Sequence, residues 1–170
     1  KGGFKLDGYK EIIPSSKLKD SQHAELFDTL VAHTDLTQNA EVIGNAEPVM
    51  SKSGYDDIIF SMDLVKVLPK KENVSKFLLA AILQDKKFKA HCLGYVNGTT
   101  VLHLSKKALP EYKLLLPSDF STLKPLDEVV TALYKQVSSN ISENTYLEEL
   151  RESLLPKLMS GELDVSDIDL

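Results

Sequence analysis

A spaced seam of apolar residues in the last third of the chain constrains the fold more than any other feature. In alternating steps of four and three, seven of ten successive positions are apolar, the ten being Leu126, Val130, Leu133, Val137, Asn140, Asn144, Leu147, Arg151, Leu154 and Leu158. This spacing keeps a narrow stripe on one side of a helix, as in coiled coils. It predicts a long C-terminal helical arm of coiled-coil type that packs against other helices.

The ends of this arm can be placed from its prolines and glycine. We expect it to begin near Pro125, because proline is tolerated in a first helical turn. It should run for about 30 residues, or roughly 45 Å, until Pro156 ends or kinks it. Gly161 then predicts a stop, followed by an acidic tail. Asn140 and Asn144 interrupt the seam, where polar residues can fix register and partner choice.

The rest of the chain predicts a globular domain. Extended segments are expected at 9–13, 26–32, 48–50, 58–68, 99–104 and 112–116, with a polar loop at 33–41. Asn73 is a suitable N-cap for a helix that fades near 86–89, with a buried stripe at Val74, Phe77, Leu78, Ala81 and Ile82. Asn97-Gly98 predicts a turn. Without regular βαβ alternation, the fold class is α+β (mixed α/β).

Composition is that of an ordinary soluble domain. The chain has 170 residues, of which 42% are hydrophobic and 26% charged, enough for one sizeable core and unlike a disordered chain. No apolar run approaches the roughly 18 residues of a membrane span, and we expect no leader segment. A single cysteine, Cys92, excludes an intrachain disulfide and fits a reducing compartment. We therefore expect a cytoplasmic protein.

Charge is unevenly distributed along the chain. The net charge of −5 argues by itself against a nucleic-acid partner. However, residues 126–170 carry −7 and residues 1–125 carry +2, while 62–113 contains ten lysines against four acidic side chains. Such a basic face can bind phosphate, because salt confines the field of a charge to roughly 10 Å. The same lysines are equally consistent with an ordinary solvated surface.

Residue groupings that would support catalysis are weak. The histidines show no metal-ligand spacing with one another, and the adjacent pair His91-Cys92 cannot by itself build a tetrahedral site. The run HTD at 33–35 is better explained by hydrogen bonding at a strand end than by acid-base chemistry. There is no Gly-rich phosphate loop, and Cys92 is interpreted as a small buried hydrophobe. We predict no catalytic residues, no metal and no cofactor.

Three polar loops contain side chains of the types that read DNA. Asn and Gln can pair with adenine and Lys with guanine, Thr can pack on the thymine methyl group, and lysines with backbone amides hold phosphates. The candidate DNA-binding residues are Thr34, Asp35, Thr37, Gln38, Asn39, Lys52, Ser53, Tyr55, Tyr95, Asn97, Thr99 and Thr100. Loops are polar in most proteins, so this composition is only a weak signal.

Segments spread over nearly the whole chain carry a family resemblance. They are LVAHTDLTQNAEVIG (30–44), IIFSMDLVKVLP (58–69), VSKFLLAAIL (74–83), GYVNGTTVLHLSKKALPEYKLLLP (94–117), PLDEVV (125–130) and LEELRESLLPKLMSGEL (147–163). The most specific is the last, a leucine-rich helix that leads into LLPKLMSGE. Together they resemble the specificity subunit of type I restriction-modification enzymes.

This resemblance implies an adaptor. In that family a target-recognition domain reads one half of a split DNA sequence, and a conserved helical region is a spacer and dock for the modification (methyltransferase) subunits, which connect it to the restriction subunit. The corresponding parts here are 1–120 for the recognition domain, 121–160 for the arm and 161–170 for the acidic tail. The expected partner-binding residues are Leu133, Val137, Leu147, Leu150, Leu154 and Leu158.

The chain departs from the family pattern in two ways. Family members usually carry two recognition domains and two helical regions, whereas this chain has one of each, in the order of the C-terminal half. It also contains no Trp and lacks the family's opening Gly-Trp segment, so we expect a recognition domain truncated at its N-terminus. A half-length chain could restore two-fold geometry by pairing its arm with that of a second copy.

Three functions stay open on the sequence. The leading one is a sequence-specific subunit, or half-subunit, that binds double-stranded DNA and tethers the modification subunits. The alternative is an interaction or scaffold module that assembles through its arm and never reads DNA, which the −7 arm and the truncated start favour. A stand-alone hydrolase ranks last.

Overall fold

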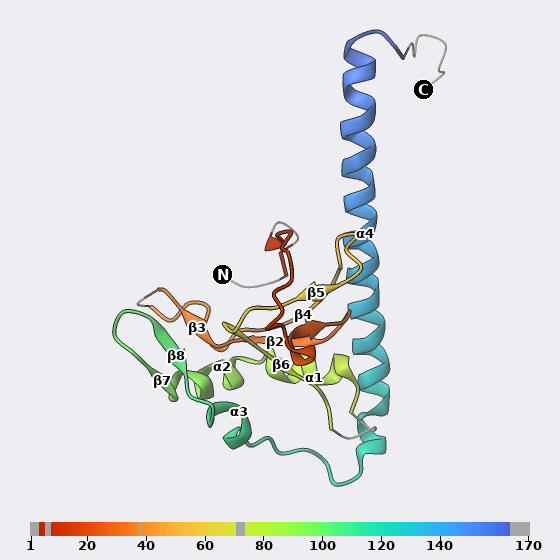
Figure 1. Ribbon diagram of the computed structural model, residues 1–170. Helices are drawn as coiled ribbons and strands as arrows, with labels where there is room; N and C mark the ends of the chain where they lie inside the picture. Colours follow the sequence, from red (N-terminus) through yellow and green to blue (C-terminus); the bar gives the residue numbers. More distant parts are fainter. Residues whose placement is uncertain (1–3, 6–7, 38, 71–73, 164–170) are drawn as a thin grey trace.

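A computed structural model describes residues 4–5, 8–37, 39–70 and 74–163. It shows an α+β domain followed by one long helix (Figure 1), which confirms the predicted fold class. The elements are η2 Asp20–Gln22, β1 His23–Ala24, β2 Thr29–Ala32, β3 Thr34–Asp35, β4 Ala46–Pro48, β5 Ile58–Ile59, β6 Leu64–Val67, α1 Lys76–Leu83, α2 Lys86–Leu93, β7 Val96–Asn97, β8 Leu102–Leu104, α3 Ala108–Glu111, η3 Phe120–Leu123 and α4 Lys124–Met159.

The strands form three small antiparallel sheets, in the orders β1–β5, β4–β2–β6 and β3–β8–β7. In the central sheet, Val31 of β2 faces Ala46 of β4 on one side and Val65 of β6 on the other. The β3–β8–β7 sheet lies at the end of the domain away from α4 (Figure 1). The domain therefore has two distinct ends, one at this sheet and one at the arm.

A cluster of apolar side chains joins the sheets to the short helices. Val31 of β2, Phe88 and Cys92 of α2, and Leu104 of β8 are each at most 2% exposed. Gly44 approaches α2 so closely that a Cβ there would lie 2.7 Å from Cβ of Cys92, and its φ of 77° is one that favours glycine. The loop before β4 therefore packs directly on α2.

A buried ion pair fixes α1 against the central sheet. Asp28 is 2% exposed, and its carboxylate accepts a hydrogen bond from Nζ of Lys76 at 2.5 Å and lies 3.6 Å from Nζ of Lys66. Burial alone would raise the pKa of Asp28. The two lysines and the backbone N–H of Glu25 outweigh burial and lower the pKa, so the carboxylate stays ionised as the lysines require.

The first half of α4 packs against α1 and the loop after β4. The ring centroids of Tyr134 and Phe77 lie 6.0 Å apart, and the Tyr134 hydroxyl donates to the side chain of Gln84. Ser138 is buried, and its hydroxyl donates to the backbone carbonyl of Met50 at 2.6 Å. These contacts fix the direction of the arm relative to the domain.

The second half of α4 projects away from the domain (Figure 1). The helix has 36 residues, which corresponds to about 54 Å at 1.5 Å per residue. Every residue from 146 to 159 is exposed. Of the ten seam residues only Val130 is partly covered, so the chain by itself leaves nearly the whole apolar seam exposed.

The helix does not end at Pro156, which was one of the two outcomes expected there, because α4 continues through it to Met159. Proline has no N–H, so the helical bond to the carbonyl of Glu152 is missing. Glu152 and Pro156 are both exposed, and water can replace this bond. The predicted stop at Gly161 is confirmed, since the helix is capped at Ser160 and Gly161 has a φ of 73°.

Two other boundaries near the centre of the chain also differ. The N-cap of α1 is Ser75, whose hydroxyl accepts from the backbone N–H of Leu78 at 3.0 Å, whereas Asn73 lies outside the described residues. Where fading was expected, a second helix begins behind Asp85, which accepts from the N–H of Lys87 at 2.7 Å. A capping carboxylate can start a new helix one turn after the previous helix ends.

The covered surface of α1 is wider than the predicted stripe, whose five residues are all buried or half-buried. The fully buried residues of α1 are Leu78, Ala80 and Leu83, so only Leu78 of the expected stripe is among them. The reason is that α1 lies between the sheets and α4 and is covered from more than one side.

Two expected extended segments join no sheet in the described part of the chain. Residues 8–13 contain no strand, and the Tyr9 hydroxyl there donates to the carbonyl of Ser51 at 2.7 Å. Residues 112–116 form no ladder after α3, and Leu115 is 100% exposed. Strand composition is insufficient where no neighbouring edge accepts the segment.

We predict that Ser138→Ala lowers the free energy of unfolding by about 1–2 kcal/mol, because it leaves the carbonyl of Met50 without a donor. Urea denaturation measures this loss. The matched control is Ser142→Ala, because the Ser142 hydroxyl donates only to the carbonyl of Ser138 in its own helix, at 3.1 Å. Equal losses in both variants would contradict the assigned role of Ser138.

Candidate nucleic-acid interface

The β3–β8–β7 sheet has one face toward the core and one toward solvent. On the inner face, Asp35 and Leu104 are buried. On the outer face, Thr34 of β3 and Asn97 of β7 both lie opposite His103 of β8. Directly opposed residues project from the same face of a sheet. Thr34, His103 and Asn97 therefore form one polar row across three strands, which we call the outer row.

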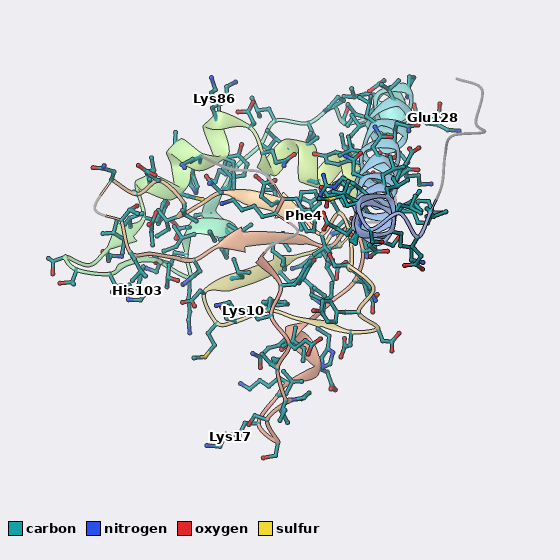
Figure 2. All side chains as sticks on the ribbon, turned by 90° about the horizontal axis from the view of Figure 1, so that it is seen from above. Phe4, Lys10, Lys17, Lys86, His103 and Glu128 are labelled. Carbon is teal, nitrogen blue, oxygen red and sulfur yellow. The ribbon has the colours of Figure 1, made fainter. Side chains whose placement is uncertain are left out.

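Figure 2 shows His103 on the side of the domain away from α4. His103 was not among the residues expected to bind DNA, whereas both of its neighbours in the outer row were. Its place between Thr34 and Asn97 depends on the pairing of β8 with β3, a strand that is distant in sequence. The sequence signal for it was the strand composition of residues 99–104.

The β7–β8 hairpin ends in a tip at residues 98–101, as the Asn97-Gly98 pair predicted. Gly98 has a φ of 112°, and a Cβ there would lie 2.1 Å from the backbone oxygen of Val101. Only glycine fits this conformation. The tip carries Thr99 and Thr100, both exposed, next to the end of β3.

The loop after β3 is shaped by the buried carboxylate of Asp35. Its Oδ1 accepts from the backbone N–H and the hydroxyl of Thr37 at 2.8 and 2.7 Å. Its Oδ2 accepts from the backbone N–H groups of Val42 and Ile43 at 2.6 and 3.0 Å. Burial alone would raise the pKa of Asp35, but these bonds outweigh it and hold the pKa well below its ordinary value.

These hydrogen bonds determine which side chains of the loop after β3 can contact a ligand. Both oxygens of Asp35 are used inside the loop, and the Thr37 hydroxyl donates to one of them. Asn39 is exposed, and Gln38 lies outside the described residues. Nζ of Lys89 on α2 closes the loop by donating to the backbone oxygen of Glu41 at 2.5 Å. The loop is thus held in one shape from inside and from α2.

A turn at residues 61–64, which the sequence did not single out, is joined to the other end of β3. The carboxylate of Asp63 accepts from the hydroxyl of Thr34 at 2.6 Å and from the hydroxyl of Ser61 at 3.1 Å. The backbone N–H of His33 donates to the carbonyl of Asp63 at 2.7 Å. This turn therefore lies beside the outer row.

Basic side chains gather around the same strand. Burial, together with the charges of His103 and Lys106, lowers the pKa of His33, and Asp63 opposes this in part. Lys106 and Lys107 follow β8 directly and are exposed. Two of the ten lysines in the locally basic segment 62–113 therefore follow a strand of the outer row.

The structure does not bring the second candidate loop to this face. Lys52, Ser53 and Tyr55 follow Met50, whose carbonyl binds the arm through Ser138, so this loop lies at the arm end of the domain (Figure 1).

Side chains of this second loop already contact other parts of the protein. Nζ of Lys52 lies 2.9 Å from the carboxylate of Glu25, and the ring of Tyr55 lies 6.2 Å from that of Tyr9. The Tyr95 hydroxyl, close to β7, similarly donates to Glu111 at 2.6 Å.

The arm provides a second candidate site, at the opposite end. An apolar groove of about 480 Å³ runs along its root, between α4 and the domain. Leu133 and Val137 of the arm line it together with Phe4 and Met50. Figure 2 looks down the arm and shows Phe4 beside it. The six expected partner-binding residues are all exposed by at least 38%: Leu133, Val137, Leu147, Leu150, Leu154 and Leu158.

Catalytic or metal-binding groupings are not apparent in the described part of the chain. No cluster of three His, Cys, Asp or Glu side chains suited to a metal ion occurs among the described residues. Burial raises the pKa of Cys92 to about 11, so its thiol is neutral at physiological pH. The described helices also include none that is both long and apolar enough to cross a membrane.

Comparison with known proteins gives one informative similarity. The chain is 24% identical over 173 residues, covering 91% of its length, to the type I restriction enzyme HindI specificity subunit of Haemophilus influenzae. It spans 36% of the length of that relative. No family model matches the chain. The similarity supports the resemblance seen in the sequence and extends over both the domain and the arm.

We predict that Asp35→Asn destabilises the protein by about 2–4 kcal/mol at pH 7, because the amide keeps one acceptor and turns a donor toward backbone N–H groups. The folded pKa of Asp35 lies below its ordinary value of 3.8. The stabilisation is therefore fully present above that value and is lost as pH falls below it. Urea denaturation between pH 7 and pH 3 should show a constant difference that shrinks below about pH 4.

The exposed residue Asp56 provides the control, since Asp56→Asn should leave the free energy of unfolding within about 0.5 kcal/mol of the parent protein. A pH-independent difference for Asp35→Asn would show that its charge is not what holds the loop.

Proposed function

We propose that this chain is the sequence-reading part of a type I restriction-modification specificity subunit, or a half-subunit of that kind, with no catalytic role of its own. In this proposal the domain binds one half of a bipartite double-stranded DNA target. The arm docks the modification subunits and, through them, the restriction subunit. The system would act in the cytoplasm.

The observation that carries the DNA-reading role is the outer row with its neighbours. Thr34, His103 and Asn97 lie side by side on an exposed sheet face, flanked by the hairpin tip and by the loop that Asp35 holds. Thr and Asn side chains can bond to base edges, and the nearby basic residue Lys106 can contact phosphate. Chemistry for base contacts and for phosphate contacts is thus present on one surface.

Within this proposal the candidate residues have different roles. Thr34, Asn39, Asn97, Thr99 and Thr100 are assigned to contact DNA from the outer face or beside it, and Gln38 is assigned with them. The Thr34 hydroxyl donates to Asp63 at 2.6 Å and the Asn97 amide donates to the carbonyl of Tyr95 at 3.3 Å, so each would meet a base through its remaining hydrogen-bonding capacity. Asp35 and Thr37 shape the loop from inside.

The remaining candidates are less favourably placed. Tyr95 is bonded to Glu111, and Lys52, Ser53 and Tyr55 lie at the arm end. Lys52, Ser53 and Tyr55 can reach DNA only if the duplex extends along the domain toward the arm.

The proposed docking role rests on the exposed seam of α4. Leucines at 147, 150, 154 and 158 lie on a helix that is surrounded by solvent, and leucines at this spacing pack into a facing helix. A modification subunit could supply that helix. A second copy of the chain could also do so, with its arm reaching the groove at Leu133 and Val137.

We predict that two substitutions in the domain affect different properties, one the preference for the target sequence and the other the affinity for any duplex. Asn97→Ala should lower the preference for the target over random duplex by about tenfold and leave the salt dependence unchanged, because it removes a base contact. Lys106→Ala should weaken binding to all duplexes and reduce the log–log salt slope by about 0.9, the value for one phosphate. Gel-shift titrations at several salt concentrations separate these effects.

The target duplex for these titrations comes from mapping DNA methylation in cells with and without this gene product. If the chain and its modification subunits retain no duplex of any sequence, the DNA-reading proposal fails and the scaffold alternative stands. If both variants behave like the parent protein, DNA is bound on another surface.

We predict that Leu147→Asp together with Leu154→Asp abolishes co-purification with the modification subunit, because two charges would be buried in the helix interface. The fold of the domain should not change, since both side chains project from it. Glu149→Ala with Glu152→Ala, on the other side of the helix, is the control and should co-purify normally. Normal co-purification of the double Asp variant would refute docking through this seam.

A further inference from the structure

Two large apolar side chains stand exposed on loops joined to strand β3. Leu36 is 80% exposed and Met62 is 88% exposed. Leu36 follows β3 directly, and Met62 belongs to the turn at 61–64 that Asp63 joins to Thr34. Single exposed apolar residues are common on proteins. These two differ because each is presented by a tight turn beside the outer row.

Each of the two residues occupies the centre of a three-residue turn closed by a side chain. Around Leu36, the backbone N–H of Thr37 donates to Oδ1 of Asp35 at 2.8 Å. Around Met62, the backbone N–H of Asp63 donates to Oγ of Ser61 at 3.2 Å. Such turns fix the backbone on both sides of the central residue. The side chains are therefore held outward with little loss of backbone freedom on binding.

The two turns lie beside the same face of the sheet. Leu36 directly follows the end of β3, two residues after Thr34 of the outer row. The Met62 turn contacts the same face through the Thr34–Asp63 bond.

We propose that Leu36 and Met62 are specificity-determining contacts that recognise thymine by packing on its 5-methyl group in the major groove. This rests on the proposed function, which it deepens by naming the base and the chemical group that are read. Among the four bases only thymine presents a methyl group there, and apolar side chains are suited to contact it.

The surroundings of the two side chains favour DNA over an apolar protein partner. The outer row between them is polar. The titratable groups on the elements around it include His33, His103, Lys106 and Asp63, and the carboxylate of Asp63 is already bonded to the hydroxyls of Thr34 and Ser61. Isolated apolar contacts beside basic and hydrogen-bonding groups match the floor of a major groove and its flanking phosphates.

The test is a selection of the full chain against two random 20-base-pair duplex libraries, one prepared with thymidine and one with deoxyuridine. Deoxyuridine pairs like thymidine and lacks only the 5-methyl group. The parent protein should enrich a motif from the thymidine library. Its T·A positions should lose about fourfold in preference per methyl group in the deoxyuridine library, as expected for one buried carbon.

Substitution links this loss to the two side chains. Leu36→Ala and Met62→Ala should each reduce the difference between the libraries at one position of the motif, whereas Met62→Leu should keep it. Leu115→Ala is the matched control, because Leu115 is fully exposed on a segment outside the interface. All these side chains are on the surface, so the variants should fold like the parent protein.

Each outcome decides a specific point. Equal enrichment from both libraries by the parent protein overturns the methyl contact and leaves the proposed function intact. A difference between libraries that survives both alanine substitutions assigns methyl reading to other residues and overturns the roles of Leu36 and Met62. No enrichment from either library overturns sequence reading by this chain, and this inference with it.

Discussion

The antiparallel register of β3, β8 and β7 is the constraint on which the proposed reading surface depends. Leu104 of β8 packs in the main core, and Asp35, also on the inner face, is buried with it. A slip of one residue would turn every side chain to the opposite face. Burial of Leu104 and Asp35 therefore keeps Thr34 and His103 outward and next to each other. The packing of the core thus determines which polar groups the surface offers.

Carboxylates that accept hydrogen bonds from other protein groups shape the loops of this domain. Asp35 holds the loop after β3, Asp63 joins the 61–64 turn to the same strand, and Asp28 fixes α1 against the central sheet. In each case an oxygen that could bind a ligand is used to organise the protein instead. A surface that is ordered before binding loses less conformational entropy on association. Such preorganisation favours selectivity for one arrangement of partner groups.

The two proposed activities occupy opposite ends of the molecule. The outer row lies at the end of the domain away from α4, and the exposed leucines lie on the free half of the arm (Figure 1). Tyr134 and Ser138 connect these ends by fixing the arm on α1 and on the loop after β4. A partner bound to the arm would therefore be held at a defined position relative to DNA bound at the outer row.

The sequence alone determined the fold class, the long arm, the turn after Asn97 and the exposed leucine seam, because periodicity and backbone preferences are local properties. It did not determine that α4 passes through Pro156, or that a new helix starts behind Asp85, since solvation and capping compete closely at both places. It named Thr34 and Asn97 but not His103 between them, and it grouped Lys52 with loops that lie at the other end. Only the tertiary structure decided these points, because strand register and the faces of a sheet are fixed by contacts between residues far apart in the chain.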